Sequence, residues 1–325
     1  MSKSLLLISK LSEDQIFAAE AAKVAGLTLI TVGTAQEGAS VIVREEPTVI
    51  FVDTSSEAQY RELEKEVQDS VGLFSDKISA NAIHFLAAEQ LENVQYLIQS
   101  PLFGHFIHRT YQEDPVSVGQ HYGRIVRATQ ADRAFGLANL MKENAKIQVV
   151  KIPLSSQKQS SVEAVRNYLI AAKFQTRMAT LIANAVDELL MNAMFDAPVD
   201  ELGKQMYKST SRSTQLKLEG KSAVEMHLGF DGSYVAITAV DLYGSLDKNK
   251  LLAHISKIYT DEEYKVKTSV AGAGIGLATV FHSGGSFFFV SESSSRTEVT
   301  VFFKRYDSFR MFKDQFRFIS TQFYF

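Results

Sequence analysis

The sequence contains no cysteine and no tryptophan, and only five of its 325 residues are proline. Without cysteine, the chain has no disulfide, no thiol nucleophile and no thiolate ligand for a metal. The lack of disulfides is typical of cytosolic proteins, so we expect a cytoplasmic protein. Long apolar runs are also missing. The stretch Ser4–Ser9 is too short for a signal sequence or a membrane span, and no membrane association is expected.

Neither sign of charge dominates, because 34 basic and 37 acidic residues leave a net charge of −3. Binding to nucleic-acid phosphates normally requires a basic surface, so nucleic acid is excluded as the main partner. The seven histidines do not cluster at metal-ligand spacing. What the chain does have is 46% apolar residues, which suffices for a buried core. Its length fits two domains of roughly 100–200 residues each.

The first domain, residues 1–115, alternates short apolar runs with helical patterns. Continuous apolar strands that alternate with helices predict an α/β fold, a parallel sheet with helices on both faces. The five expected strands are Ser4–Ser9, Leu27–Val32, Thr48–Val52, Ala82–Ala87 and Phe103–Ile107. Gly26 is expected to end the first helix as a C-terminal cap.

A helical stretch without proline follows over about residues 118–144, and we assign residues 116–145 to a helical connector. It is either a helical hairpin or a surface for a partner, and the connector helices are a candidate homodimer contact. The aromatic segment 309–325 is expected to pack on a domain or a dimer partner; stacking on nucleic-acid bases is the alternative.

The second domain, residues 146–308, shows long helices followed by strands that are mostly joined as hairpins. This order predicts an α+β layer. Asp231-Gly232 is a strong hairpin signal. The expected elements are a strand at 146–154, a polar loop at 155–161, helices at 162–172, 175–195, 247–258 and 275–283, and strands at 222–230, 234–240, 286–291 and 297–303.

Glu188, Asn192 and Asp196 follow one another at a spacing of four, which places them on one face of a helix. A carboxylate and a carboxamide one turn apart can hold a hydrated divalent cation such as Mg²⁺. The glutamate can also polarise a water for attack on a phosphate. The competing interpretation is a solvated helix face, with Asp196 as a cap before Pro198.

Asp241 ends an apolar strand and is followed by Gly244. A carboxylate at that position suits a donor such as an exocyclic amine, whereas a plain turn aspartate is the alternative. Gly272, Gly274 and Gly276 stand directly before an apolar helix, where glycine lets backbone amides approach an anion. The glycines match neither the dinucleotide-binding fingerprint nor a Walker motif.

In their order, these three segments resemble the GHKL ATPase superfamily, which includes histidine kinase catalytic domains, gyrase-type ATPases and bacterial anti-sigma kinases. The resemblance covers about residues 150–305. It implies a two-layer Bergerat-type domain that binds ATP and Mg²⁺. It also implies roles for single residues: Glu188 as the catalytic base, Asn192 as the metal ligand, Asp241 as the acid that contacts adenine, and Gly244, Gly272, Gly274 and Gly276 as glycines of the nucleotide-binding boxes.

The match has two departures. Leu242 and Tyr243 separate Asp241 from its glycine, where the family usually has one residue, and Asp196 occupies a region where a basic residue is common. Two functions therefore remain open. The chain is a bacterial signal-transduction protein that binds Mg-ATP and phosphorylates a protein partner or hydrolyses ATP, or it is a non-catalytic signalling adaptor.

The first domain resembles a response-regulator receiver, which implies a flavodoxin-like fold. Asp53 ends the third strand, where that family carries its phosphoacceptor. Other family residues are missing: Ser9 and Lys10 replace the acidic pair after the first strand, and His108 and Arg109 stand near the fifth strand instead of a lysine-proline pair. We interpret the domain as a pseudo-receiver that mediates interaction. Phosphorylation of Asp53 is the competing interpretation.

Overall fold

The structure is a computed structural model, and it describes residues 3–71, 79–89, 93–100, 102–131, 133–260, 285–314 and 320–325. The chain is a mixed α/β protein with two compact units. Unit 1 comprises Met1–Ala134 and Ile319–Gln322, and unit 2 comprises Phe135–Phe318 and Phe323–Phe325. In the described ranges, no helix combines the length and the apolar character that a membrane crossing requires.

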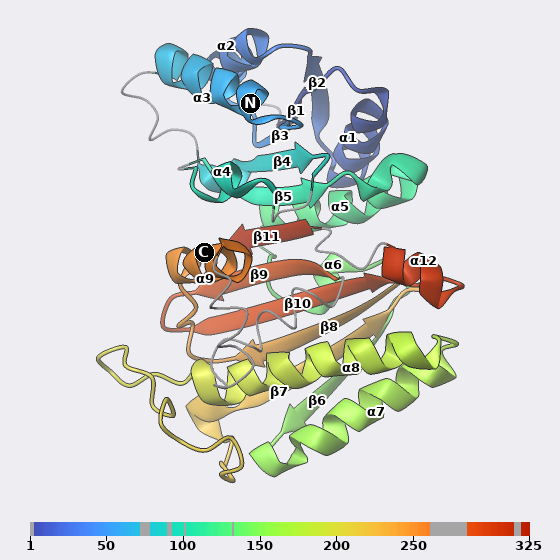
Figure 1. Ribbon diagram of the computed structural model, residues 1–325, viewed down its shortest axis with the longest axis vertical. Coiled ribbons are helices and arrows are strands. Elements are labelled where there is room, and N and C mark those ends of the chain that lie inside the picture. Colours follow the sequence, from blue (N-terminus) through green and yellow to red (C-terminus); the bar gives the residue numbers. More distant parts are fainter. Residues whose placement is uncertain are drawn as a thin grey trace. The chain divides into compact units, whose positions relative to one another are not determined.

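Unit 1 contains a parallel sheet in the order β2-β1-β3-β4-β5, and every neighbouring pair among these strands is parallel. Its strands are β1 (Ser4–Ile8), β2 (Thr28–Val32), β3 (Val49–Asp53), β4 (Ile83–Ala87) and β5 (His105–His108) (Figure 1). All five overlap the apolar runs from which they were predicted. β1, β3 and β4 are buried along almost their whole length, as the continuous apolar runs indicated.

The helices of unit 1 are α1 (Ser12–Ala25), α2 (Ala35–Glu45), α3 (Glu57–Val71), α4 (Gln95–Ile98) and α5 (Pro115–Gln130). Helix α1 ends at Gly26, whose φ of 71° is the left-handed conformation that the sequence predicted for this cap. Helix α2 begins with a capping box, in which the side chains of Thr34 and Glu37 each accept a backbone N–H of the other residue.

The helical stretch predicted over 118–144 is confirmed in part, because it contains two separate helices. Helix α5 ends at Gln130, and the short α6 (Leu137–Leu140) starts after Gly136, which has a φ of 91°. Helix α5 packs against α1, because Gly119 and Gly123 allow close approach. A Cβ at these glycines would lie 2.6 and 2.7 Å from backbone oxygens of α1. The inner face of α5 is thus covered within unit 1, and the structure gives no support to a dimer through it.

The strands of unit 2 follow the order β9-β10-β8-β7-β6, with antiparallel pairing between neighbours. They are β6 (Lys146–Ile152), β7 (Val224–Phe230), β8 (Tyr234–Asp241), β9 (Ser286–Glu292) and β10 (Arg296–Lys304). The Asp231-Gly232 hairpin is confirmed: the Asp231 carboxylate accepts the backbone N–H groups of Ser233 and Tyr234, and Gly232 has a φ of 89°.

The helices of unit 2 are α7 (Lys158–Ala171), α8 (Thr176–Met191), α9 (Lys248–Thr260) and α12 (Phe309–Asp314), besides α6. Helices α7 and α8 pack against each other, and α8 lies on β8 (Figure 1). The polar loop predicted at 155–161 is largely helical, because Ser160 and Ser161 donate their hydroxyls to the carbonyl of Gln157 in the first turn of α7. The helix predicted at 275–283 lies outside the described residues.

The aromatic segment 309–325 belongs to the fold. Strand β11 (Ser320–Tyr324) pairs antiparallel with β5 through Ser320 and Thr321 in unit 1. In unit 2, the buried ring of Phe323 stacks on Phe289 with ring centroids 5.5 Å apart. The expectation that these aromatics pack on a domain is confirmed for the described part of the segment.

Candidate functional site

The carboxyl-terminal end of α8 carries the first predicted motif. Glu188 is half-buried, and its carboxylate forms no hydrogen bond with the residues that the structure describes. Burial raises the pKa of the Glu188 carboxyl, and the charge of Asp187 adds to this effect, while Lys158 and Arg212 oppose it. A carboxyl group with a raised pKa and free oxygens has the properties of a general base.

Helix α8 changes its winding at Asn192. Residues Asn192–Asp196 form a π-helical turn, in which the backbone N–H of Ala197 donates to the Asn192 carbonyl at 2.9 Å. Such turns are rare and frequently occur at functional sites. The Asn192 side-chain amide forms no hydrogen bond with any described residue, so its oxygen is available to a cation.

Asp196 is paired with a cation through one of its two carboxylate oxygens. Its carboxylate accepts a hydrogen bond of 2.6 Å from Arg212, and the guanidinium of Arg212 lies 5.1 Å from the ring centroid of Phe195. The interpretation of Asp196 as a helix cap is therefore wrong, because the carboxylate forms an ion pair with a long-range partner. Lys158 pairs with Asp187 in the same region. The sequence did not indicate that Arg212 and Lys158 lie near this motif, because Arg212 comes from a loop and Lys158 from α7.

Asp241 lies at the end of β8 with only 5% of its surface exposed. Its carboxylate accepts the backbone N–H groups of Tyr243, at 2.9 Å, and Gly244, and the hydroxyl of Thr297. Burial raises the pKa of Asp241 to about 6, although these hydrogen bonds act in the opposite direction. No cation pairs with it among the described residues. This buried acceptor is suited to an uncharged donor, such as an amine on a heterocycle.

Gly244 allows a close approach of two backbones. Its φ is 58°, and a Cβ on this residue would lie 1.9 Å from the carbonyl oxygen of Glu292, the last residue of β9. The backbone N–H of Ser294 donates to the Gly244 carbonyl at 3.3 Å. The glycine is thus required by packing after β8, whatever else the segment does.

The first two motifs are brought together. The hydroxyl of Ser245, directly after Gly244, donates to the carbonyl of Ala197 at 2.7 Å, which ties the end of β8 to the end of the α8 turn. Gly272, Gly274 and Gly276, the third motif, lie outside the described residues. Among the described residues, no three histidine, aspartate or glutamate side chains are grouped as a metal site, so a metal at Asn192 would rely on phosphate and water oxygens.

Asp53 in unit 1 is engaged by neighbouring side chains. One oxygen, Oδ1, accepts hydrogen bonds from Arg109 Nη2 at 2.6 Å, from the Ser55 backbone N–H at 3.0 Å and from the Ser55 hydroxyl at 2.5 Å. The other oxygen forms no hydrogen bond with the described residues. Asp53 is therefore paired with a cation, and it does more than cap a strand end.

Arg109 joins Asp53 to a second carboxylate that sequence reasoning missed. Asp14 is fully buried, and its carboxylate accepts hydrogen bonds from Nε and Nη2 of Arg109, at 2.8 and 2.9 Å. The hydroxyls of Tyr111 and Ser9 each donate to Asp14 at 2.6 Å. Burial by itself would lower the pKa of Arg109, but the hydrogen bonds and charges of Asp14 and Asp53 outweigh it and raise that pKa.

No protein-family model matches the chain, and no curated protein matches it. Among solved structures, the chain resembles one chain of the crystal structure of the SiaB-SiaC complex from Pseudomonas aeruginosa. The two are 17% identical, and the match covers 48% of this chain and 88% of that chain with a TM-score of 0.31. A TM-score this low establishes neither a common fold nor a common function.

Proposed function

We propose that unit 2 binds Mg-ATP where α8 meets the end of β8, as the GHKL ATPases it resembles do, and that the chain is a bacterial signalling protein. The observation that supports this proposal best is the Ser245–Ala197 hydrogen bond. This hydrogen bond joins the turn after α8, which carries the free Asn192 amide, to the segment after β8, which follows the buried Asp241 carboxylate. The order β6-α7-α8-β7-β8-α9-β9-β10 also agrees with a Bergerat-type domain.

Each residue has a chemical role in this proposal. The Asn192 amide oxygen is one ligand of Mg²⁺, whose other ligands are phosphate oxygens and waters. Glu188 takes the proton from the attacking group, which is a hydroxyl of a protein partner or a water. Asp241 accepts the exocyclic amine of adenine. The glycines Gly272, Gly274 and Gly276 are proposed to line the triphosphate.

Nucleotide binding is tested by calorimetric titration of the full chain with ATP, with and without Mg²⁺. We expect magnesium-dependent binding that weakens in Asn192→Ala. The matched control is Asn184→Ala, since Asn184 is exposed and lies on the same helix two turns earlier. Absence of ATP binding at millimolar concentration would contradict the proposal, and so would equal affinities of the two variants.

Turnover is tested separately. Glu188→Gln should retain ATP binding and reduce phosphate release or phosphoryl transfer by roughly 10²–10⁴-fold, the usual contribution of a general base. The control is Glu219→Gln, because Glu219 is exposed and has no role in the proposal. Binding of ATP without turnover in the wild-type protein would leave the adaptor function as the better description.

That second function, a signalling adaptor with a pseudo-receiver, is favoured by the Asp53–Arg109 ion pair. Arg109 and Ser55 already hold one oxygen of Asp53, and Ser9 and Lys10 stand where a receiver carries the acidic pair that holds Mg²⁺ for phosphotransfer. We therefore propose that Asp53 does not accept phosphoryl groups. Incubation with acetyl phosphate and Mg²⁺, followed by intact-mass spectrometry, should show no added phosphate; a phosphorylated species that is lost in Asp53→Asn would overturn this.

A further inference from the structure

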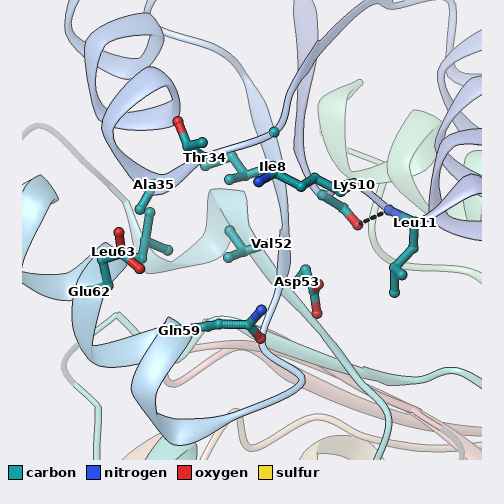
Figure 2. A pocket seen from close by; sticks show the side chains of 12 residues that line it. Ile8, Lys10, Leu11, Thr34, Ala35, Val52, Asp53, Gln59, Glu62 and Leu63 are labelled. Carbon is teal, nitrogen blue, oxygen red and sulfur yellow. Dashed lines mark hydrogen bonds between the residues drawn. The ribbon is translucent and has the colours of Figure 1, made fainter.

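An open cleft of about 290 Å³ lies in unit 1 at the carboxyl ends of β1, β2 and β3. β2 and β3 lie on either side of β1, so the chain adds β2 on one side and then crosses back to add β3 on the other. The connections after β1 and β3 therefore lie on opposite faces of the sheet. Ligands of open α/β sheets bind in the crevice at such a reversal. The inner wall of the cleft is formed by Ile8, Val52 and Leu63, which are buried apolar side chains (Figure 2).

Six polar side chains also line the cleft: Ser9, Lys10, Thr34, Asp53, Gln59 and Glu62 (Figure 2). The side-chain polar groups of Lys10, Gln59 and Glu62 form no hydrogen bond with the described residues, and neither does the Oδ2 oxygen of Asp53. Because Arg109 and Ser55 hold Oδ1 of Asp53, the orientation of the free oxygen is fixed before any ligand arrives. A small number of placed polar groups beside an apolar wall is typical of a small-molecule site.

The charges restrict the ligand. A phosphate held by the backbone N–H groups at the start of α2 is disfavoured, because the Glu37 carboxylate already accepts those of Gly33 and Thr34, at 3.1 and 3.2 Å. A divalent cation is disfavoured as well, since Arg109 lies on Asp53 and the described residues offer no cluster of three metal ligands. A ligand with one positive and one negative group fits the Asp53 carboxylate and the Lys10 ammonium.

We propose that this cleft binds an α-amino acid with an apolar side chain. Its ammonium group donates to the free oxygen of Asp53, and its carboxylate pairs with Lys10. Its side chain packs on Ile8, Val52 and Leu63. The volume of the cleft, about 290 Å³, is at the lower end of ligand sites and suits a molecule of this size. The proposal is independent of nucleotide binding by unit 2.

The test is a thermal-shift screen of the full chain against the twenty common amino acids, followed by calorimetry on those that raise Tm. We expect leucine, isoleucine, valine or methionine to raise Tm, and glycine to have a smaller effect. The Lys10→Met variant should weaken Kd at least about tenfold, the factor for loss of one charge-assisted hydrogen bond. Lys65→Met, on the exposed face of α3, should leave Kd unchanged.

A second variant, Asp53→Asn, should weaken Kd by a similar factor, with Asp69→Asn on α3 as its control. If Asp53→Asn does not fold, the test rests on Lys10→Met. This variant should fold, because the Lys10 ammonium forms no hydrogen bond with the described residues. The proposal is overturned if no amino acid raises Tm, or if Lys10→Met binds as tightly as the wild type. A response to glucose, glycerol or inorganic phosphate alone overturns it in favour of a polyol or an anion site.

Discussion

At the scale of single residues, Arg109 pairs with two carboxylates of unit 1, those of Asp14 and Asp53. Its side chain is 2% exposed, and Asp14, its bidentate partner, is 0% exposed. Two buried charges are tolerated only when they are paired and their remaining hydrogen bonds are satisfied. Asp14 meets this condition with four hydrogen bonds, of which two come from Arg109.

Arg109→Ala should therefore destabilise unit 1 by about 3–5 kcal/mol, since it leaves the Asp14 carboxylate buried and unpaired. Urea denaturation followed by circular dichroism measures this loss. Arg44→Ala is the control: Arg44 forms an exposed pair with Glu45, and a surface substitution of this kind changes stability by about 0.5 kcal/mol or less. Equal effects of the two variants would show that the buried pair is not required.

Gly244 gives a second residue-scale prediction. Gly244→Ala places a Cβ against the Glu292 carbonyl, so we expect a loss of stability well above the roughly 1–2 kcal/mol that a left-handed conformation costs an alanine. Gly203→Ala is matched, because Gly203 also has a positive φ of 75° but no atom lies within 4 Å of the added Cβ. Thermal unfolding of both variants separates the steric contribution from the conformational one.

At the scale of elements, local patterns predicted most strands and the ends of several helices. β8 and the Asp231-Gly232 turn, for example, appear where an apolar run and a turn dipeptide stand in the sequence. The division of the connector into α5 and α6 could not be predicted, because the sequence pattern does not show that α5 ends at Gln130 and that Gly136 adopts a φ of 91°. The π turn at Asn192 also has no local signal, since the same residues satisfy an ordinary helical pattern.

The contribution of the segment 309–325 to stability can be tested at Phe323. Phe323→Ala should destabilise the protein by about 3–5 kcal/mol, because its ring is 1% exposed and stacks on Phe289. Phe325→Ala, two positions later and 41% exposed, should have a much smaller effect. Chemical denaturation is the measurement. A similar loss in both variants would mean that the segment contributes by its general hydrophobicity.

At the scale of the whole molecule, unit 1 should be the acid-sensitive part. Burial, and then the neighbouring His105, lower the pKa of His84 well below its usual value, and the two rings lie 4.2 Å apart. His84 is thus neutral when folded and gains a proton near pH 6.5 when unfolded. Its contribution to stability is complete above pH 6.5 and is lost as the pH falls below that value, by at most about 1.4 kcal/mol per pH unit.

Hydrogen exchange of β4 amides between pH 7.5 and 5 checks this expectation, since these amides should lose protection on acidification. In His84→Phe, which keeps an aromatic ring beside Phe51, the pH dependence should become flatter. An unchanged pH dependence in this variant would contradict the assignment to His84.

The sequence predicted the α/β class and three candidate ligand-binding segments, but it could not predict their surroundings. Glu188 and Asn192 follow from helical spacing, whereas Arg212 approaches them from a loop without a recognisable pattern. Likewise, Asp53 was predicted from its position after a strand. Its partner Arg109 and the buried Asp14 are far from it in the sequence, and only the folded unit brings the three side chains together.

The strand pairing of β11 has a consequence for the synthesis of the chain. β5 ends at His108, and its antiparallel neighbour begins only at Ser320. At a translation rate of about 5–20 residues per second, the outer edge of β5 waits roughly ten to forty seconds for its partner. An unpaired edge strand can pair with other chains. During synthesis, the edge of β5 therefore stays open to pairing with other chains until Ser320 and Thr321 have been added.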